Sequence, residues 1–316
     1  MCIYVPMCLC GEDSYICPMS ILITGANGFV GYYLVKDLLK TGEKVLATGR
    51  GKSVYDFSTF PNYQYVQLDF TDPFAVHDFF EKYQPAMVIH AGAMSKPDDC
   101  EARQWEAYTT NTEGTLTLLM NAAEYKSFFL FLSTDFVFSG NEGMYTEEAE
   151  RAPVNFYGKT KMEAEDAVME YEGDWAIART VLVYGPQQGS RGNLLTVVKD
   201  KLQKGETYNV FNDQVRTPTY VGDLVKGLLS IVSKKHTGIF HLSGEDVRTP
   251  YEMAVETAAY LGMDTSLIHS TTEAEFIQPA KRPGKTGFNI EKAKRVLGFQ
   301  PISFQEGMKK TFNTSI

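Results

Sequence analysis

The stretch TGANGFVG, residues 24–31, decides the fold of this chain. It follows an apolar run at residues 20–24 and overlaps residues 29–39, where apolar side chains recur at the spacing of a helix face. Three glycines at intervals of three residues allow a tight turn and a close backbone approach to a pyrophosphate, which then faces the helix N-terminus. In this strand–turn–helix context, the glycine triplet predicts a dinucleotide-binding unit.

The alternation of strand and helix continues along the chain. Short apolar runs predict strands at residues 44–47, 65–68, 87–90, 128–133 and 176–179. Helical spacing predicts helices at residues 73–83, 102–123 and 157–171. Repeated β-α-β units predict an α/β fold with a doubly wound parallel sheet, the Rossmann fold.

The regular alternation breaks down past Pro186. Gly, Pro and Asn are scattered through residues 185–218, and a helix-rich segment runs from Pro250 to the end. We expect residues 20–186 and about 217–247 to form an NAD(P)-binding domain. Residues from about 187 to 216 and 248–316 are then a smaller, mostly helical C-terminal lobe that binds the substrate. Residues 1–19 are expected to be a non-structural extension.

The composition excludes several classes of protein. The 316 residues are 44% hydrophobic and 22% charged, which is typical of a soluble globular protein. A net charge of −9 argues against a nucleic-acid partner, and no uncharged apolar run is long enough to span a bilayer. Four of the five cysteines, Cys2, Cys8, Cys10 and Cys17, lack the spacing of a zinc site, and no metal is expected. A reduced, cytoplasmic location fits this pattern.

The residues after the second predicted strand bear on the choice of cofactor. An NAD site usually places an Asp or Glu about 20 residues beyond the glycines. Here Arg50, Lys52 and Ser53 stand in that place, within a segment that has no carboxylate. Two cations and a hydroxyl suit a phosphate, so the loop predicts NADP(H) as the preferred cofactor, with NAD(H) as a second option. The alternative is a solvated loop with ordinary surface charges. Asp69 is placed either to meet the adenine or to form an Asx turn.

A candidate catalytic set follows in the second half of the sheet. In YGKTK, residues 157–161, Tyr157 and Lys161 share one helix face. A neighbouring ammonium lowers the pKa of a tyrosine and helps the phenol exchange a proton near neutral pH. Thr134 lies at the carboxyl end of a predicted strand and can bond the same substrate oxygen. A second Tyr-x-x-x-Lys pair, Tyr32 and Lys36, lies behind the glycine loop and is interpreted as accidental.

Together these motifs resemble the extended short-chain dehydrogenase/reductase family, from about Met19 to the end of the chain. The segments that carry the resemblance are residues 24–31, 90–93, 133–138 and 157–161, together with Asn111. Within that family the chain is most similar to the dTDP-4-dehydrorhamnose reductases, through residues 133–138, 213–219 and 282–283.

The resemblance implies an NAD(P)H-dependent reductase whose partner is a 4-keto nucleotide-deoxysugar. It implies that Tyr157 protonates the keto oxygen, Lys161 also holds the nicotinamide ribose, Thr134 orients the carbonyl, and Asn111 supports the lysine. The implied cofactor-binding residues are Gly25, Asn27, Gly28, Phe29, Gly31, Arg50, Lys52, Ser53, Asp69, Phe70, Ala91, Gly92, Ala93, Tyr157 and Lys161. The implied substrate-binding residues are Thr134, Asp135, Gln214, Arg216 and Arg282. The resemblance also allows a homodimer.

Two departures from the family pattern keep alternatives open. The run Arg216-Thr217-Pro218-Thr219 stands where Gly-Ser-Pro-Thr is frequent, and His90-Ala91-Gly92-Ala93 replaces a double-Ala run. One alternative is a nucleotide-sugar 4-epimerase or dehydratase. The dehydratases place acids beside the catalytic Thr, and here Phe136 follows Asp135 where a second acid is usual. Another alternative is a non-catalytic, NADP-binding regulatory subunit like the β subunit of methionine adenosyltransferase.

Overall fold

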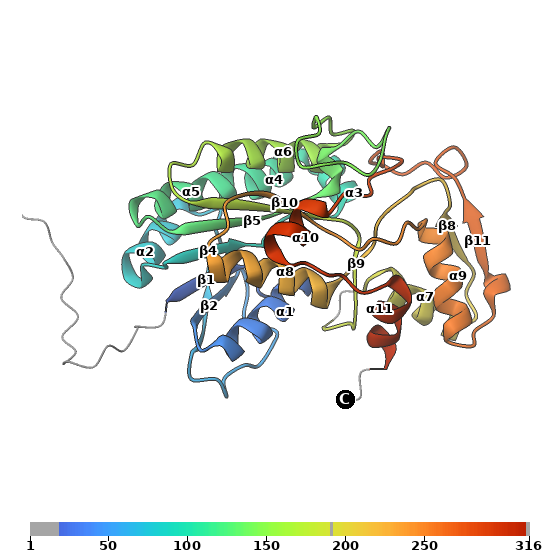
Figure 1. Ribbon diagram of the computed structural model, residues 1–316, viewed down its shortest axis with the longest axis horizontal. Coiled ribbons are helices and arrows are strands. Elements are labelled where there is room, and N and C mark those ends of the chain that lie inside the picture. The colour runs from blue at the N-terminus through green and yellow to red at the C-terminus, as the bar shows by residue number, and fades with distance from the viewer. Residues whose placement is uncertain (1–18, 190–191, 314–316) are drawn as a thin grey trace, which may run out of the picture.

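The computed structural model describes residues 19–189 and 192–313, and the cysteines of the expected extension lie outside them. Seven strands form one parallel sheet in the order β10-β6-β5-β4-β1-β2-β3 (Figure 1). They are β1 (Ser20–Thr24), β2 (Lys44–Gly49), β3 (Tyr63–Gln67), β4 (Met87–His90), β5 (Phe128–Thr134), β6 (Trp175–Thr180) and β10 (Gly238–Leu242). The predicted doubly wound parallel sheet is confirmed. The strand order reverses between β1 and β4, so a ligand crevice is expected at their carboxyl ends.

Helices cover both faces of this sheet, which is why its strands are apolar on both sides (Figure 1). On one face lie α1 (Phe29–Leu38), α8 (Val221–Lys234) and α10 (Glu291–Leu297), and α8 packs against both of the others. On the other face lie α2 (Pro73–Tyr83), α5 (Gly114–Glu124) and α6 (Phe156–Met169). The strands alternate between the two cores: Ile21 and Ile23 pack in the first, and Leu22 packs in the second.

A smaller lobe lies beside the carboxyl end of the sheet (Figure 1). It contains α7 (Leu194–Gln203), α9 (Pro250–Tyr260), α11 (Phe304–Phe312) and a parallel pair of strands, β8 (Tyr208–Phe211) and β11 (Ile268–Thr271). Val198, Val210 and Ala254 belong to its own apolar core. A second short pair, β7 (Val183–Tyr184) and β9 (Thr219–Tyr220), lies where the chain enters and leaves α7 and β8. The sequence did not predict these four short strands.

The single helix predicted at residues 102–123 is wrong. The structure has α3 (Pro97–Ala102), α4 (Gln104–Tyr108), a π-turn (Thr109–Glu113) and then α5. Arg103 leaves the helical region with φ −131° and ψ 60°, which separates α3 from α4. The π-turn contains three threonines, whose branched side chains fit a regular helix less well. Such turns often occur at functional sites, and this one carries Asn111.

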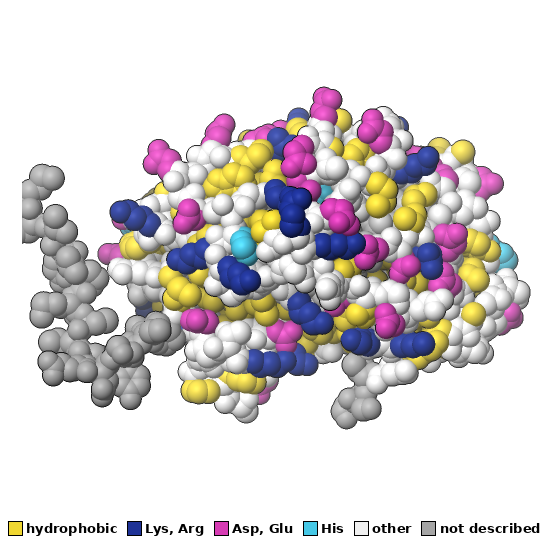
Figure 2. Space-filling view, in the orientation of Figure 1, with side chains coloured by type: hydrophobic (Ala, Val, Ile, Leu, Met, Phe, Trp, Pro, Cys, Tyr) yellow, Lys and Arg dark blue, Asp and Glu magenta, His cyan; other side chains and the backbone are white. Residues whose placement is uncertain are grey.

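Figure 2 shows acidic and basic side chains interspersed over the face in view. Within the described ranges, no helix has the length and apolar character needed to cross a membrane.

Candidate active site

A cavity of about 750 Å³ lies at the carboxyl end of the sheet. One part is lined by the glycine loop, the end of β2 and residues 91–93, and we call this the cofactor half. The other part is lined by residues from the lobe, among them Asn193, Gln214, Arg216 and Arg282, and we call this the substrate half. Leu132, Thr134, Tyr157 and Lys161 lie between the two halves. This is the crevice expected from the strand order.

The glycine loop is shaped by close backbone contacts. Gly25 has φ +70°, and a Cβ atom there would lie 2.8 Å from the backbone of Ala91 and Gly92. At Gly31 a Cβ atom would lie 2.1 Å from the carbonyl oxygen of Gly25. Gly28 is the N-cap of α1 and brings no capping side chain, so the amides of the first turn remain available to an anion. The loop therefore fits a pyrophosphate, as the spacing of its glycines predicts.

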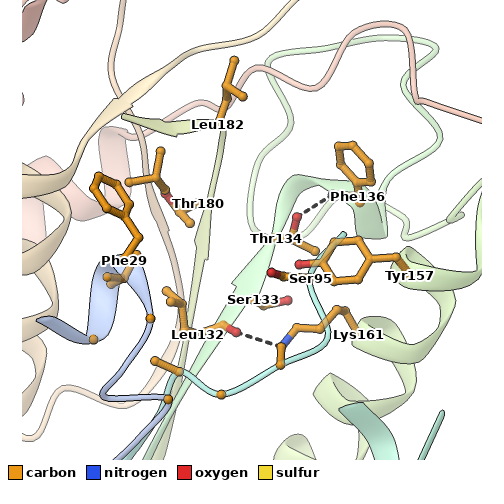
Figure 3. Close-up of a pocket in the computed structure, with 18 of the residues that line it drawn as sticks. Phe29, Ser95, Leu132, Ser133, Thr134, Phe136, Tyr157, Lys161, Thr180 and Leu182 are labelled. Carbon is orange, nitrogen blue, oxygen red and sulfur yellow. Dashed lines mark hydrogen bonds between the residues drawn. The ribbon is translucent and has the colours of Figure 1, made fainter. Parts of the chain in front are cut away.

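Of the four predicted catalytic residues, Thr134, Tyr157 and Lys161 line this cavity and Asn111 does not. Figure 3 shows the hydroxyl end of Tyr157 pointing toward Thr134 and Ser95, with Lys161 on the same helix. The helix can approach because residue 158 is glycine: a Cβ atom there would lie 2.1 Å from the carbonyl oxygen of Phe136. The Tyr157 ring also meets the Phe136 ring edge-on, with centroids 5.8 Å apart.

Lys161 is almost fully buried. Its ammonium donates to the carbonyl oxygen of Leu132 at 2.9 Å and lies 3.7 Å from the centroid of the Phe131 ring (Figure 3). Burial lowers the pKa of Lys161 to about 7, against a smaller opposing effect of Glu165. Its charge near neutral pH is therefore sensitive to an anion that binds beside it.

Asn111, which is expected to support Lys161, bonds two other parts of the chain, and its support of the lysine stays a prediction. Its amide oxygen accepts from the backbone N–H of Met94 at 2.8 Å, and its NH₂ group donates to the carbonyl oxygen of Met94 and to Thr160 Oγ1, both at 3.0 Å. It thus ties the segment after β4 to the helix that carries Tyr157. No direct hydrogen bond from Asn111 to Lys161 occurs in the described structure.

His90 begins the run of residues 90–93, which is one of the two departures from the family pattern. It is buried, with Nδ1 2.6 Å from Thr24 Oγ1 and Nε2 3.1 Å from Thr115 Oγ1. Since Thr115 donates its proton to the carbonyl oxygen of Asn111, His90 must donate from Nε2 and accept at Nδ1. Burial holds the pKa of His90 well below its usual value, so the ring is neutral and joins β1 to α5.

Asp135 lines the cavity, but its carboxylate is bound to protein groups. It accepts from Thr134 Oγ1 at 3.1 Å and from the hydroxyl of Thr286, and Arg216 Nε lies 3.9 Å away. Burial raises the pKa of Asp135 above its ordinary value, while the charge of Arg216 opposes that rise. Thr134 also accepts from the backbone N–H of Phe136 at 3.2 Å.

The predicted cofactor residues divide into two groups. Arg50, Phe70, Ala91, Gly92 and Ala93 line the cavity, together with the loop residues Gly25, Asn27, Gly28, Phe29 and Gly31. Lys52, Ser53 and Asp69 do not line it. Ser53 donates to the carbonyl oxygen of Tyr55 at 2.7 Å. Asp69 accepts from the backbone and the hydroxyl of Thr71, which is the alternative Asx-turn geometry.

The predicted cations of the substrate half are already bonded to the protein. Arg216 donates to the carbonyl oxygens of Val215, Pro283 and Gly284 and to the side-chain oxygen of Gln214. Arg282 makes a two-pronged ion pair with Asp98, at 2.7 and 2.8 Å. The pair holds the pKa of Asp98 below its ordinary value.

Several cavity residues were missed by the sequence analysis. They include Ser95, Leu132, Phe136, Thr180, Leu182, Asn193, Leu194 and Pro250. Thr180 could have been found, because it ends the strand beside β5 and pairs in register with Thr134. Leu182 and the lobe residues carry no comparable signal, because their position depends on how the lobe packs.

The glycine loop and the Thr134–Tyr157–Lys161 set on a Rossmann sheet define the class of a short-chain dehydrogenase/reductase. More narrowly, the chain belongs to the family described as "RmlD substrate binding domain", which matches residues 19–316. The resemblance inferred from the sequence is confirmed.

The curated relatives of the chain include a reductase and a subunit of another enzyme. The chain is 30% identical over 303 residues to the dTDP-4-dehydrorhamnose reductase of Aggregatibacter actinomycetemcomitans, covering 92% of this chain and 97% of that protein. It is 29% identical over 316 residues to subunit beta of mouse methionine adenosyltransferase 2, covering 98% of this chain and 92% of that one.

Among solved structures, a dTDP-4-dehydrorhamnose reductase from Bacillus anthracis in complex with NADP is similar, with a TM-score of 0.83 and 26% identity. The match covers 95% of this chain and all of that one. The corresponding protein from Clostridium acetobutylicum matches with a TM-score of 0.82 and 30% identity, over 93% of this chain and 99% of that one.

Proposed function

We propose that the chain is an NADP(H)-dependent reductase of a 4-keto nucleotide-deoxysugar, like the dTDP-4-dehydrorhamnose reductases. The observation that carries the proposal is the position of Tyr157, Lys161 and Thr134 in the cavity that the glycine loop also lines (Figure 3). The relatives that are reductases, and the related structure that contains NADP, support the same function.

The residues of the chain have distinct roles in this reaction. The glycine loop would hold the pyrophosphate, Arg50 would meet the 2′-phosphate, and the bound nicotinamide cofactor would supply the hydride. Tyr157 donates the proton to the keto oxygen, and the Lys161 ammonium favours the resulting phenolate. Thr134 hydrogen-bonds the keto oxygen after its hydroxyl turns away from Asp135.

The test is consumption of NADPH by the purified full chain with a dTDP-linked 4-keto-6-deoxysugar. We expect turnover by the wild-type protein and little turnover by Tyr157→Phe. If the wild-type protein binds NADPH but consumes none with any 4-keto nucleotide-sugar, the reductase proposal is wrong.

The regulatory-subunit alternative is the second candidate, because a specific observation favours it. Arg216 and Arg282 use their charged donors within the protein, which an enzyme for a nucleoside diphosphate sugar has no evident reason to do. The similarity to methionine adenosyltransferase 2 subunit beta supports this regulatory-subunit alternative. Co-elution with a methionine adenosyltransferase catalytic subunit, together with absent NADPH consumption, would favour this candidate.

The dehydratase alternative has less support. A dehydratase acid beside the catalytic Thr must reach the substrate, and Asp135 is buried and bonded to Thr134 and Thr286.

A further inference from the structure

The loop of residues 50–54, here called the Arg50 loop, is exposed along its whole length. Its backbone is nevertheless bonded to three side chains from two other places in the chain, the strand β3 and the glycine loop. Gln67 donates to the carbonyl oxygen of Arg50 at 2.9 Å, and Tyr65 donates to that of Gly51 at 2.6 Å. Asn27 donates to the carbonyl oxygen of Lys52 at 3.0 Å and accepts from the N–H of Val54 at 3.1 Å.

Tyr65 is the centre of this arrangement. Its hydroxyl donates to Gly51 and accepts from Asn27 Nδ2 at 2.9 Å, so it joins β3, the glycine loop and the Arg50 loop. The contact requires glycine at residue 49, where a Cβ atom would lie 2.8 Å from the Tyr65 hydroxyl. Burial raises the pKa of Tyr65 above its ordinary value, so the phenol keeps its proton and remains a donor.

These bonds leave the donors of the Arg50 loop available. The carbonyls of residues 50–52 are all occupied, whereas the backbone N–H groups of Gly51, Lys52 and Ser53 bond to no other group of the described chain. Arg50 lines the cavity, and its guanidinium pairs with no carboxylate in residues 19–189 and 192–313. A run of free amides beside a free guanidinium is suited to an anion.

We propose that Tyr65 is a positioning residue for the 2′-phosphate of the cofactor, assisted by Gln67 and Asn27. It holds the Arg50 loop so that the donors are in place before the phosphate arrives, which reduces the ordering cost of binding. The Ser53 hydroxyl is not part of this site, because it faces Tyr55. The inference rests on the proposed use of NADP(H). It makes the selectivity for NADP(H) over NAD(H) depend on Tyr65, a residue of β3 that does not itself contact the phosphate.

The chain provides a matched control. Tyr63 lies two residues earlier on the same strand, and its hydroxyl is 3.3 Å from Ser53 Oγ. It bonds no backbone group of the Arg50 loop within the described structure. Removal of its hydroxyl therefore changes the same chemical group on the same strand without releasing the loop.

The experiment measures binding by calorimetry of adenosine 2′,5′-bisphosphate and of 5′-AMP, which differ in the 2′-phosphate. We expect the wild-type protein to prefer the bisphosphate. Tyr65→Phe should weaken bisphosphate binding about tenfold, on the scale of one strong hydrogen bond, and leave AMP binding unchanged. Tyr63→Phe should keep the wild-type preference. The exposed variant Gln67→Ala should lower the preference in the same direction as Tyr65→Phe, and thermal melting confirms that each variant is folded.

Three outcomes overturn the inference. In the first, Tyr65→Phe keeps the full preference for the bisphosphate over 5′-AMP. In the second, Tyr65→Phe lowers the affinity for both probes equally, as a general structural defect would. In the third, the wild-type protein binds both probes with the same affinity. A wild-type protein that binds neither probe, nor NADPH and NADH, would instead contradict the proposed function itself.

Discussion

The two halves of the cavity hold their cations in opposite ways. In the cofactor half, Arg50 lines the cavity on a loop fixed by Tyr65 and forms no ion pair within the described residues. In the substrate half, Arg216 donates to backbone carbonyls and Arg282 is paired with Asp98. Both regions look basic in the sequence, but of Arg50, Arg216 and Arg282 in the described ranges, Arg50 alone is left unpaired for a ligand. A sequence motif therefore shows that a cation is present. The groups around that cation in the folded chain determine whether it can bind a ligand.

The cations of the substrate half hold a segment of the chain in place. Arg216 donates to the carbonyl oxygens of Pro283 and Gly284, and Arg282 pairs with Asp98, so both hold the segment of residues 280–286. Asn155 also donates to the carbonyl oxygen of Lys281 at 2.7 Å while it caps α6, the helix that carries Tyr157. The lobe and the catalytic helix are thus joined through this segment.

The largest expected effect tests the catalytic role of Tyr157, which lies between the cofactor half and the substrate half. Tyr157→Phe should lower kcat by about 10²–10⁴-fold, because the phenol supplies the proton in the transition state. NADPH affinity should be nearly unchanged, because the ring still packs against Phe136. Tyr32→Phe, in the second Tyr-x-x-x-Lys pair, is the control and should retain activity. Turnover of Tyr157→Phe within a few-fold of wild type would remove Tyr157 from the mechanism.

The next effect tests whether Arg50, the unpaired cation, recognises the 2′-phosphate of the cofactor. Arg50→Asp should reverse the preference for NADPH over NADH, by about 10–100-fold in kcat/KM, because a charge-assisted contact is lost and a ribose acceptor is gained. Lys52→Asp makes the same charge change outside the cavity lining and should have a smaller effect. If Arg50→Asp still prefers NADPH, the cofactor half does not recognise the 2′ position through this residue.

A smaller effect tests whether Arg282 can bind a ligand once its ion pair with Asp98 is removed. Asp98→Asn removes the charge that holds Arg282, so dTDP should bind up to about fivefold more tightly, since a half-exposed ion pair is worth at most about 1 kcal/mol. Asp99→Asn, at the next residue of α3, is the control. Calorimetry with dTDP measures both variants. Unchanged affinity in Asp98→Asn would mean that the substrate half recognises its ligand without Arg282.

A further effect, on stability rather than on turnover or binding, concerns Lys161, which lies between the halves. Its pKa is about 7 in the folded chain and about 10.4 when unfolded, so the unfolded chain binds more protons between these values. The destabilisation caused by burying this ammonium is therefore complete below about pH 7 and fades toward pH 10.4. The difference in melting temperature, Lys161→Met minus wild type, should be level up to about pH 7 and should then fall toward pH 9.5. A difference that is independent of pH would contradict the lowered pKa.

The local features of the fold were predictable from the sequence. The strands at residues 20–24 and 87–90 and the helix at residues 73–83 have the bounds that apolar spacing predicts. The helix at residues 102–123 was wrong, because spacing does not reveal a residue such as Arg103 that leaves the helical region, or a π-turn. The strands β7 and β9 were missed because they are two residues long. The strands β8 and β11 were missed because polar residues, Asn209 in the first and His269, Ser270 and Thr271 in the second, interrupt the apolar run that marks a strand such as β4.

The parallel sheet, the glycine loop and the residues that meet at the carboxyl end of β5 follow from local patterns in the sequence. Strand alternation and i, i+4 spacing are local, and parallel strands bring their carboxyl ends to one edge. Which charged side chains are free depends instead on how the chain packs. Arg50 and Arg216 are alike in the sequence, but the partners of Arg216 lie up to 68 residues further along the chain. Such partners come close only when the lobe packs against the sheet, and they then occupy the donors that a ligand would need.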